Sequence, residues 1–398
     1  MIFPDSDKMN FRSFLLLLAF ALCAETASAL EYVRFLHDGK ERNEEGRIFT
    51  ATDGSLFEAS DGFVLEARDG QVYAIAKNNL LARRSDEIPF EPYTKSEMLE
   101  RLKNEFGEGY NYLDNYDSFI VVYTTSKPFA TWYGNLLKKL HEQIVTHWKK
   151  HGVELVQPQF MLVAVVLSNE ERFRQYAKQD GVSLLKQQCA YYHKWTNRIA
   201  MYDMSGQQVF QERDQSRVNA LDMRRFLAQP GAYQNIMTVT HEAVHQIGFN
   251  TGMHVQFAPS PVWLYEGLAI FHEVPDLRNF NNMGWTLGPH VNHPRLDQLR
   301  QYWTMSHQEP PIQKMIKDDE LFRKPVTALN HYALAWGLVY YLERRRPKEL
   351  AAYLKILQEK TFDSDDSDEI RIADFESCFG NDWDKFYGDF AGFIRGLR

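Results

Sequence analysis

The chain has 398 residues, a formal net charge of −8 at pH 7 and 44% hydrophobic residues. This length suits one large domain with a small addition, and the apolar content is ample for a packed core. A mildly acidic chain without a basic stripe argues against a nucleic-acid partner.

The N-terminus has the pattern of a secretory signal peptide. Lys8 and Arg12 precede an apolar run of eleven residues, Phe14 to Ala24, and Ala27-Ser28-Ala29 is an A-x-A cleavage site. Cleavage there removes residues 1–29. Eleven apolar residues are too few to span a bilayer, so a retained anchor is the weaker alternative. We therefore expect a secreted, periplasmic or cell-envelope protein with no stable membrane insertion after cleavage.

Residues 30–92 are predicted to form a small β-rich module. Asp-Gly pairs between short apolar runs are a strong hairpin signal, and they stand at Asp38-Gly39, Asp53-Gly54, Asp61-Gly62 and Asp69-Gly70. The expected strands are Arg47–Thr50, Phe63–Ala67 and Val72–Ile75. The stretch Ile88–Pro92 contains two prolines, which resist both helix and central strand. It is expected to link the module to a second domain over residues 93–398.

The first part of residues 93–398 alternates between strand and helix patterns. Strands are expected at Phe119–Thr124, Met161–Leu167 and Arg198–Tyr202. Helices are expected over Ala130–Lys150 and, from a capping box formed by Ser168 and Glu171, to about Lys178. This mixture predicts an α+β domain.

The helix expected over Asn235–Ile247 carries the pattern His241-Glu242-Ala243-Val244-His245. Two histidines four residues apart project from one helix face, so both imidazoles can reach one metal ion. Glu242 stands beside them, where it can act on a metal-bound water. An apolar stripe is expected to pack the helix, made of Ile236, Val239, Ala243 and Ile247.

A second helix, expected to begin at Pro261, carries Glu266 within the apolar segment Val262–Phe271. Burying an acidic residue there is costly unless it is paired or bound to metal. With His241 and His245, Glu266 completes the ligand set of a catalytic zinc site, which keeps its fourth position open. The alternatives are hydrogen-bonded structural histidines and, for Glu266, a salt bridge between two helices.

The two motifs H-E-x-x-H and W-L-x-E-G-L-A resemble those of the gluzincin branch of zinc metallopeptidases. Within that branch, the chain resembles a bacterial family of secreted peptidase-MA-like proteins. Arg198–Asp203 and His331–Leu338 resemble that family too, and the likeness covers roughly residues 115–395. It implies a zincin-like catalytic domain, of the thermolysin or gluzincin type, with C-terminal helices after the zinc motifs.

The resemblance also implies roles for individual residues. The implied Zn²⁺ ligands are His241, His245 and Glu266, and the implied general base is Glu242. Arg198–Tyr202 would be the edge strand along the cleft, where an extended substrate adds by backbone pairing; an ordinary edge strand without a ligand is the alternative. Tyr332 would donate a hydrogen bond to the oxyanion, with His331 as the alternative donor and a packing role for Tyr332 as the other interpretation.

Residues around the ligands are less well defined by the pattern. Glu273 lies two turns after Glu266 and is a candidate to orient a ligand histidine. The acidic residue that thermolysin-like enzymes have four positions after the glutamate ligand is absent, since Ile270 stands there. His254 lies between the two zinc motifs and is a weaker candidate for substrate contact.

Three C-terminal helices are expected, over His331–Arg344, Lys348–Lys360 and Trp383–Leu397. The acidic run Asp363–Glu369 lacks the mid-loop glycine and final glutamate of a calcium loop, so it is interpreted as a solvated linker. Cys189 and Cys378 remain after signal cleavage, and they either form one disulfide or stay two separate thiols.

Together these features predict a secreted zinc metallopeptidase that hydrolyses a peptide or protein substrate. Glu242 accepts a proton from a zinc-activated water, which attacks the carbonyl, and then passes that proton to the leaving amine. The Gly-x-Met-Glu-Asn segment of gluzincin aminopeptidases is missing, which favours an endopeptidase. Two other functions fit the motifs: a non-catalytic, zinc-stabilised envelope binding protein, and a zinc amidase acting on non-peptide or cell-wall substrates.

Overall fold

Two units make up the described part of the chain, and they divide between Pro92 and Tyr93. The computed structural model describes residues 28–49, 58–59, 62–186, 188–204, 221–222, 225, 230–274, 290–306, 311–361 and 364–398. Residues 1–27 of the predicted signal peptide, Thr50 of a predicted strand and the predicted turn Asp53-Gly54 lie outside these residues. Among the helices of the described ranges, none has both the length and the apolar character that a bilayer crossing requires.

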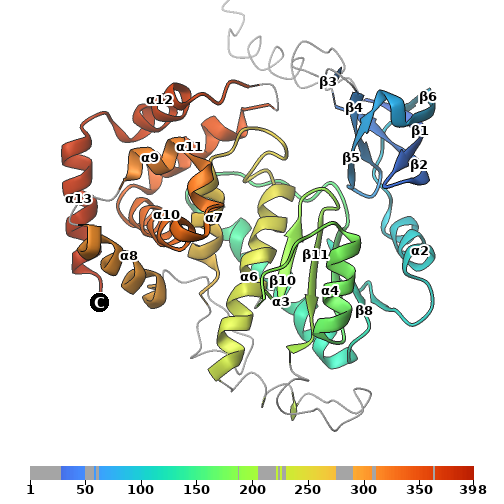
Figure 1. Cartoon of the computed structure of the whole chain (residues 1–398), viewed down its shortest axis with the longest axis horizontal. Helices are drawn as coiled ribbons and strands as arrows, with labels where there is room; N and C mark the ends of the chain where they lie inside the picture. Colours follow the sequence, from blue (N-terminus) through green and yellow to red (C-terminus); the bar gives the residue numbers. More distant parts are fainter. Residues whose placement is uncertain are drawn as a thin grey trace, which may run out of the picture. The chain divides into compact units, whose positions relative to one another are not determined.

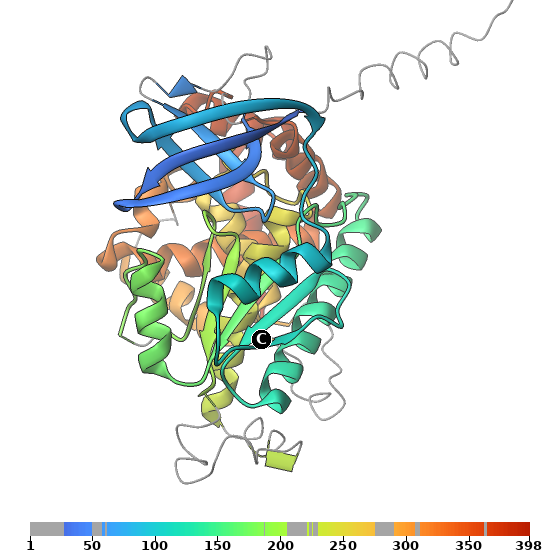
Figure 2. The same ribbon diagram turned by 90° about the vertical axis from the view of Figure 1, so that its right-hand side faces the viewer.

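The N-terminal unit is a six-stranded antiparallel sheet. Its strands are β1 Ala29–His37, β2 Lys40–Ile48, β3 Glu58–Ala59, β4 Gly62–Ala67, β5 Val72–Ala76 and β6 Leu80–Pro89. The order is β3-β4-β2-β1-β6, with β5 paired to β4, and the strands (blue in Figure 2) curve strongly. Asp38 and Gly39 both have positive φ, 50° and 72°, which is the conformation that a two-residue hairpin turn requires.

The β-rich character predicted for this unit is confirmed, and two predicted strands match β4 and β5. The strand predicted at Arg47–Thr50 is instead the end of the longer β2. Most residues of β2 are charged, so the sequence has no apolar alternation that would show where the strand begins. Its pairing with β1 sets its length instead. The predicted linker begins too early, because Ile88 and Pro89 belong to β6. β6 is an edge strand, where the missing N–H of a proline can be tolerated.

A five-stranded mixed sheet organises the larger unit, in the order β10-β11-β9-β8-β7. Its strands are β7 Asn111–Leu113, β8 Phe119–Tyr123, β9 Leu162–Leu167, β10 Ala190–His193 and β11 Arg198–Tyr202. The central strands β8, β9 and β11 run parallel, and both edge strands are antiparallel to their neighbours. The three strands predicted for this part of the chain are therefore present.

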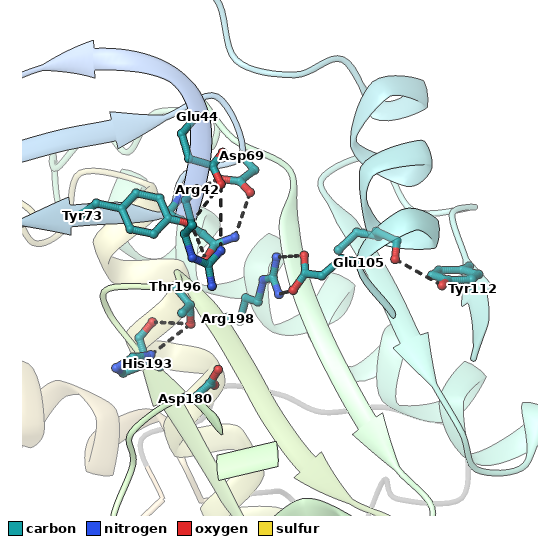
Figure 3. Close-up of polar contacts among 12 residues, drawn as sticks. Arg42, Glu44, Asp69, Tyr73, Glu105, Tyr112, Asp180, His193, Thr196 and Arg198 are labelled. Atoms are coloured by element: carbon teal, nitrogen blue, oxygen red, sulfur yellow. Dashed lines mark hydrogen bonds and ion pairs between the residues drawn. The ribbon is translucent and has the colours of Figure 1, made fainter. Parts of the chain in front are cut away.

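The prediction that Arg198–Tyr202 forms the edge of this sheet is wrong, because β10 lies outside it. All five residues of β11 are buried. Arg198 is tolerated there because its guanidinium bonds both carboxylate oxygens of Glu105, at 2.5 and 2.8 Å (Figure 3). Glu105 belongs to helix α2, Lys95–Phe106, which the sequence patterns did not predict. The edge strand next to β11 is β10.

Helices cover both faces of this sheet. α6, Pro230–Asn250, and α3, Lys127–Lys150, pack against each other on one face, and α4, Glu170–Gln179, covers the other (Figure 1). α3 is the helix predicted over Ala130–Lys150. The capping residue of α4 is Asn169, not the predicted Ser168, because the Asn169 side chain accepts a backbone hydrogen bond from the first turn.

Beyond α6 the described chain is helical, as the resemblance implied. Its elements are α7 Val262–His272, α8 His293–Ser306, α9 Ile312–Lys317, the 3₁₀ helix η5 Asp319–Phe322, α10 Pro325–Arg345, α11 Pro347–Gln358, α12 Asp368–Phe379 and α13 Trp383–Gly396. α10 packs against α7 and α8 and buries Trp336 completely. In Figure 1, α6 lies between the sheet and the pair α7 and α10.

The interpretation of the acidic run as a solvated linker is only partly right, since α12 begins inside it. Asp368 and Glu369 stand in the first turn of α12, where the helix dipole favours negative charge. Asp366 forms an ion pair with Arg371, whose guanidinium also bonds Asp319 at 2.8 Å. The run therefore helps to fix α12 against η5.

Cys189 and Cys378 are both free thiols, so the disulfide alternative is wrong. Cys189 is buried next to β10, and Cys378 is half-buried in α12. Burial raises the pKa of the Cys189 thiol to about 11, so this side chain stays protonated and behaves as a small apolar group.

Candidate metal centre

Helix α6 carries three of the predicted site residues and is fixed to the sheet by Gln246. The predicted apolar stripe is buried, at Ile236, Val239, Ala243 and Ile247. Gln246 is fully buried, and its Nε2 donates to the carbonyl oxygens of Val163 at 3.1 Å and Asn197 at 2.8 Å. These hydrogen bonds, to β9 and to the residue before β11, fix the position of α6 relative to the strands.

The structure brings His241, His245 and Glu266 together. The Nε2 atoms of His241 and His245 are 3.0 Å apart, and Glu266 Oε2 lies 3.2 Å from the first and 3.6 Å from the second. Glu266 reaches them from α7, which packs against α6. Three donor atoms from two helices thus converge on one point.

These distances fit a tetrahedral zinc ion. Two nitrogen ligands bound about 2.0–2.1 Å from one tetrahedral zinc lie about 3.3–3.4 Å apart, which is close to the observed spacing. The donor set of two imidazoles and one carboxylate is also one that zinc prefers. An imidazole Nε2 pair at 3.0 Å presents two lone pairs to each other unless a proton or a cation stands between them.

Glu273 orients the first histidine. His241 Nδ1 lies 2.9 Å from Glu273 Oε2, so Nδ1–H donates to Glu273 and Nε2 is the nitrogen that faces Glu266 and His245. The second carboxylate oxygen of Glu273 accepts from Asn292 Nδ2 at 3.0 Å, and Asn292 Oδ1 caps α8 by accepting from Arg295 N. The sequence suggested Glu273 for this position, whereas nothing in the pattern pointed to Asn292.

Glu242 is held by the edge strand of the sheet. Its Oε2 accepts a hydrogen bond from the backbone N–H of Tyr192 in β10 at 2.8 Å. This amide therefore points away from β11, toward Glu242 in α6. Among the described residues, no hydrogen bond joins Glu242 to the three donor atoms. A backbone amide leaves no trace in a side-chain pattern, so sequence reasoning missed this contact.

The charges of the site are strongly coupled. Burial alone lowers the pKa of His241, but hydrogen bonds to Glu266 and Glu273 outweigh it and raise that pKa well above its usual value. Burial raises the pKa of Glu266, yet the imidazoles of His245 and His241 lower it far below its usual range. Burial also raises the pKa of Glu242, and the same two imidazoles oppose that rise. The site thus carries an ionised carboxylate beside two histidines and a second, more basic carboxyl.

Tyr332 lies near this site, whereas His331 has its polar contacts elsewhere. Burial and the charges of Glu266 and Glu242 raise the pKa of Tyr332, so its hydroxyl stays a hydrogen-bond donor. His331 is buried, with Nδ1 2.8 Å from the carbonyl oxygen of Thr327 in its own helix. Of the two predicted oxyanion donors, only Tyr332 is therefore in the electrostatic field of the two carboxylates.

His254 is placed against α6 rather than on an open surface. Its side chain is 3% exposed, and its ring packs 5.2 Å from Phe249 and 6.2 Å from Tyr265 between centroids. Burial, together with the nearby His245, lowers the pKa of His254 to about 3. A buried neutral ring that packs on two aromatic groups favours a structural role over the predicted substrate contact.

A pocket of about 700 Å³ lies on α10, α12 and α13. It includes Tyr341, Arg345 and Phe386, none of which is a candidate site residue. The centre is assigned from its donor chemistry and spacing.

Comparison with known proteins adds one finding for this region. A family model described as a protein of unknown function, DUF1570, matches residues 235–363. The matched segment runs from α6 into the residues after α11 and includes His241, Glu242, His245, Glu266 and Tyr332. A comparison with curated proteins gives no match.

Proposed function

We propose that this protein is a secreted zinc metallopeptidase with a zincin-like, gluzincin-type catalytic domain. The observation that carries this proposal is the convergence of His241, His245 and Glu266, whose donor atoms are 3.0–3.6 Å apart, next to Glu242. Three protein ligands leave a fourth tetrahedral position open, which is the pattern of catalytic rather than structural zinc. The ion would supply a Lewis acid that makes water a stronger acid and polarises a carbonyl.

Glu242 is the proton carrier in this proposal. Burial makes it a better base than an exposed glutamate, and the Tyr192 amide holds it in one orientation. It would accept the proton of the attacking water and deliver it to the leaving amine, so the peptide C–N bond breaks without a free amide anion. Tyr332 would donate to the oxygen on which negative charge develops.

The edge strand β10 is the proposed binding site for an extended substrate. Its antiparallel partner β11 covers one side only, and the N–H of Tyr192 on the other side already bonds Glu242. An extended peptide that pairs with this open side would lie beside Glu242. This arrangement supports a peptide or protein substrate. It also supports an endopeptidase, which binds its substrate on both sides of the scissile bond.

A direct test measures zinc content and peptide hydrolysis together. Wild type, Glu242→Gln and Glu142→Gln are compared by metal analysis and with a quenched fluorescent peptide library. Glu142 is exposed on α3 and serves as the matched glutamate control. We expect about one zinc ion at this centre in all three and a loss of hydrolysis of at least about 1,000-fold in Glu242→Gln alone.

Other outcomes distinguish the alternatives. Zinc binding without hydrolysis of any library peptide would favour an envelope binding protein or an amidase, and muropeptides in the same assay separate these two. Near-wild-type hydrolysis by Glu242→Gln would contradict the proposed mechanism. N-terminal sequencing of the exported protein tests cleavage after Ala29.

A further inference from the structure

A second His-His-Glu group lies outside the centre described above. His147 and His151 stand four residues apart on α3, and Glu343 faces them from α10. Glu343 Oε1 lies 3.6 Å from His147 Nε2 and 3.7 Å from His151 Nε2. The imidazole centroids are 4.6 Å apart, compared with 4.7 Å for His241 and His245. The two histidine pairs therefore have the same spacing.

The donor atoms of this group face one another. His151 Nδ1 lies 2.9 Å from the carbonyl oxygen of His147, so Nδ1–H donates to that oxygen and Nε2 is the nitrogen that faces Glu343. His147 Nε2 is buried and has no hydrogen-bond partner within the described residues. The same holds for Glu343 Oε2, although Arg344 Nε lies 3.8 Å from it. Two buried atoms of this group thus have no hydrogen-bond partner among the residues that the structure describes.

A third histidine lies beside this cluster. His272, the last residue of α7, is 2% exposed, and its ring centroid is 5.6 Å from that of His147. Neither of its ring nitrogens has a hydrogen-bond partner in the part of the chain that the structure describes. Buried polar groups without partners are rare and costly, so a bound ion would stabilise the atoms that lack one here.

The charged contacts within this group are longer than hydrogen bonds. Glu343 Oε1 lies 3.6 and 3.7 Å from the two Nε2 atoms, and Arg344 Nε lies 3.8 Å from Glu343 Oε2. An imidazole nitrogen with a free lone pair is the form that binds a metal ion.

We propose that His147, His151 and Glu343 bind a second divalent transition-metal ion. Two imidazoles and one carboxylate are donors suited to zinc, and the ion would link α3 to α10. The ring of His272 packs beside His147, and His272 is next to Glu273, which orients His241. The second ion would therefore lie near the residues that support the first centre.

Metal stoichiometry in matched variants tests the second site. Wild type, Glu343→Gln, Glu266→Gln, the double variant and Arg344→Gln are equilibrated with buffered zinc and analysed for bound metal. Arg344→Gln changes the next residue of the same helix and removes a charge without removing a donor. We expect about two ions per chain in wild type and in Arg344→Gln, about one in each single glutamate variant, and about none in the double variant.

The metal content of these variants distinguishes a missing first site from a missing second site. If the first centre does not bind metal, wild type and Glu266→Gln each hold about one ion and Glu343→Gln holds none, which supports the second site alone. If Glu343→Gln holds as much metal as wild type, the second site is refuted. If Glu343→Gln does not fold, His151→Phe is tested instead, in the Glu266→Gln background and with cobalt(II) as the probe. Loss of the absorption bands of tetrahedral cobalt(II) in His151→Phe supports the second site, and retention of these bands refutes it.

Discussion

Glu273→Gln probes how the structure orients His241. Glu273 is 4% exposed, with one oxygen 2.9 Å from His241 Nδ1 and the other accepting from Asn292 Nδ2. A glutamine has one oxygen for these two donors. If that oxygen faces Asn292, the amide NH₂ opposes His241 Nδ1–H, and if it faces His241, the NH₂ opposes the Asn292 NH₂. Asn292 cannot flip freely, because its own oxygen caps α8 through Arg295 N.

The expected cost follows from this donor–donor conflict. Loss of a hydrogen bond behind a metal-bound histidine weakens metal binding by about 10–100-fold, which is about 1.4–2.7 kcal/mol. The proposed assay is competition for zinc with a chromogenic chelator at neutral pH, with thermal unfolding to confirm that the variant folds. Because Glu343→Gln removes the other proposed ion, the measurement is made in that background.

A rescue variant makes the prediction specific. In Glu273→Gln with Asn292→Asp, the new carboxylate accepts from the glutamine NH₂ and still caps α8, so the glutamine oxygen is free to accept from His241. We expect the double variant to recover most of the lost zinc affinity. Unchanged affinity in Glu273→Gln, or no recovery in the double variant, would refute this account of how the histidine is held.

Two further predictions concern packing and pH. A Cβ on Gly267 in α7 would lie 2.6 Å from a methyl of Val339 in α10, so Gly267→Ala should destabilise the fold by about 1–3 kcal/mol in urea unfolding. The control is Gly388→Ala in α13, where nothing lies within 4 Å of the added Cβ, and it should be neutral or stabilising by up to about 1 kcal/mol. Equal changes in the free energy of unfolding for the two variants would contradict the reasoning. His254 has a folded pKa of about 3, below its unfolded value, so it contributes stability above about pH 6.5 that is lost as the pH falls toward 3. His254→Gln should flatten the acid side of the stability curve, and an unchanged slope between these pH values would show that the ring is not buried neutral.

The sequence alone predicted the parts of this protein that depend on local periodicity. His241 and His245 share a helix face because 3.6 residues make one turn, and the same periodicity suggested that Glu273 follows Glu266 on one side of α7. Apolar runs likewise predicted β8, β9 and the buried stripe of α6. These features need only neighbours within one element.

Tertiary structure decided the features that join distant segments. Arg198 and Glu105 are 93 residues apart, and their pairing explains how the buried interior strand β11 accommodates an arginine. The Tyr192 contact to Glu242 uses a backbone amide, which every residue except proline has, so residue type cannot reveal it. His147 and Glu343 come together only when α3 and α10 pack, because the distance between two helices is set by long-range packing and leaves no periodic signal in either segment.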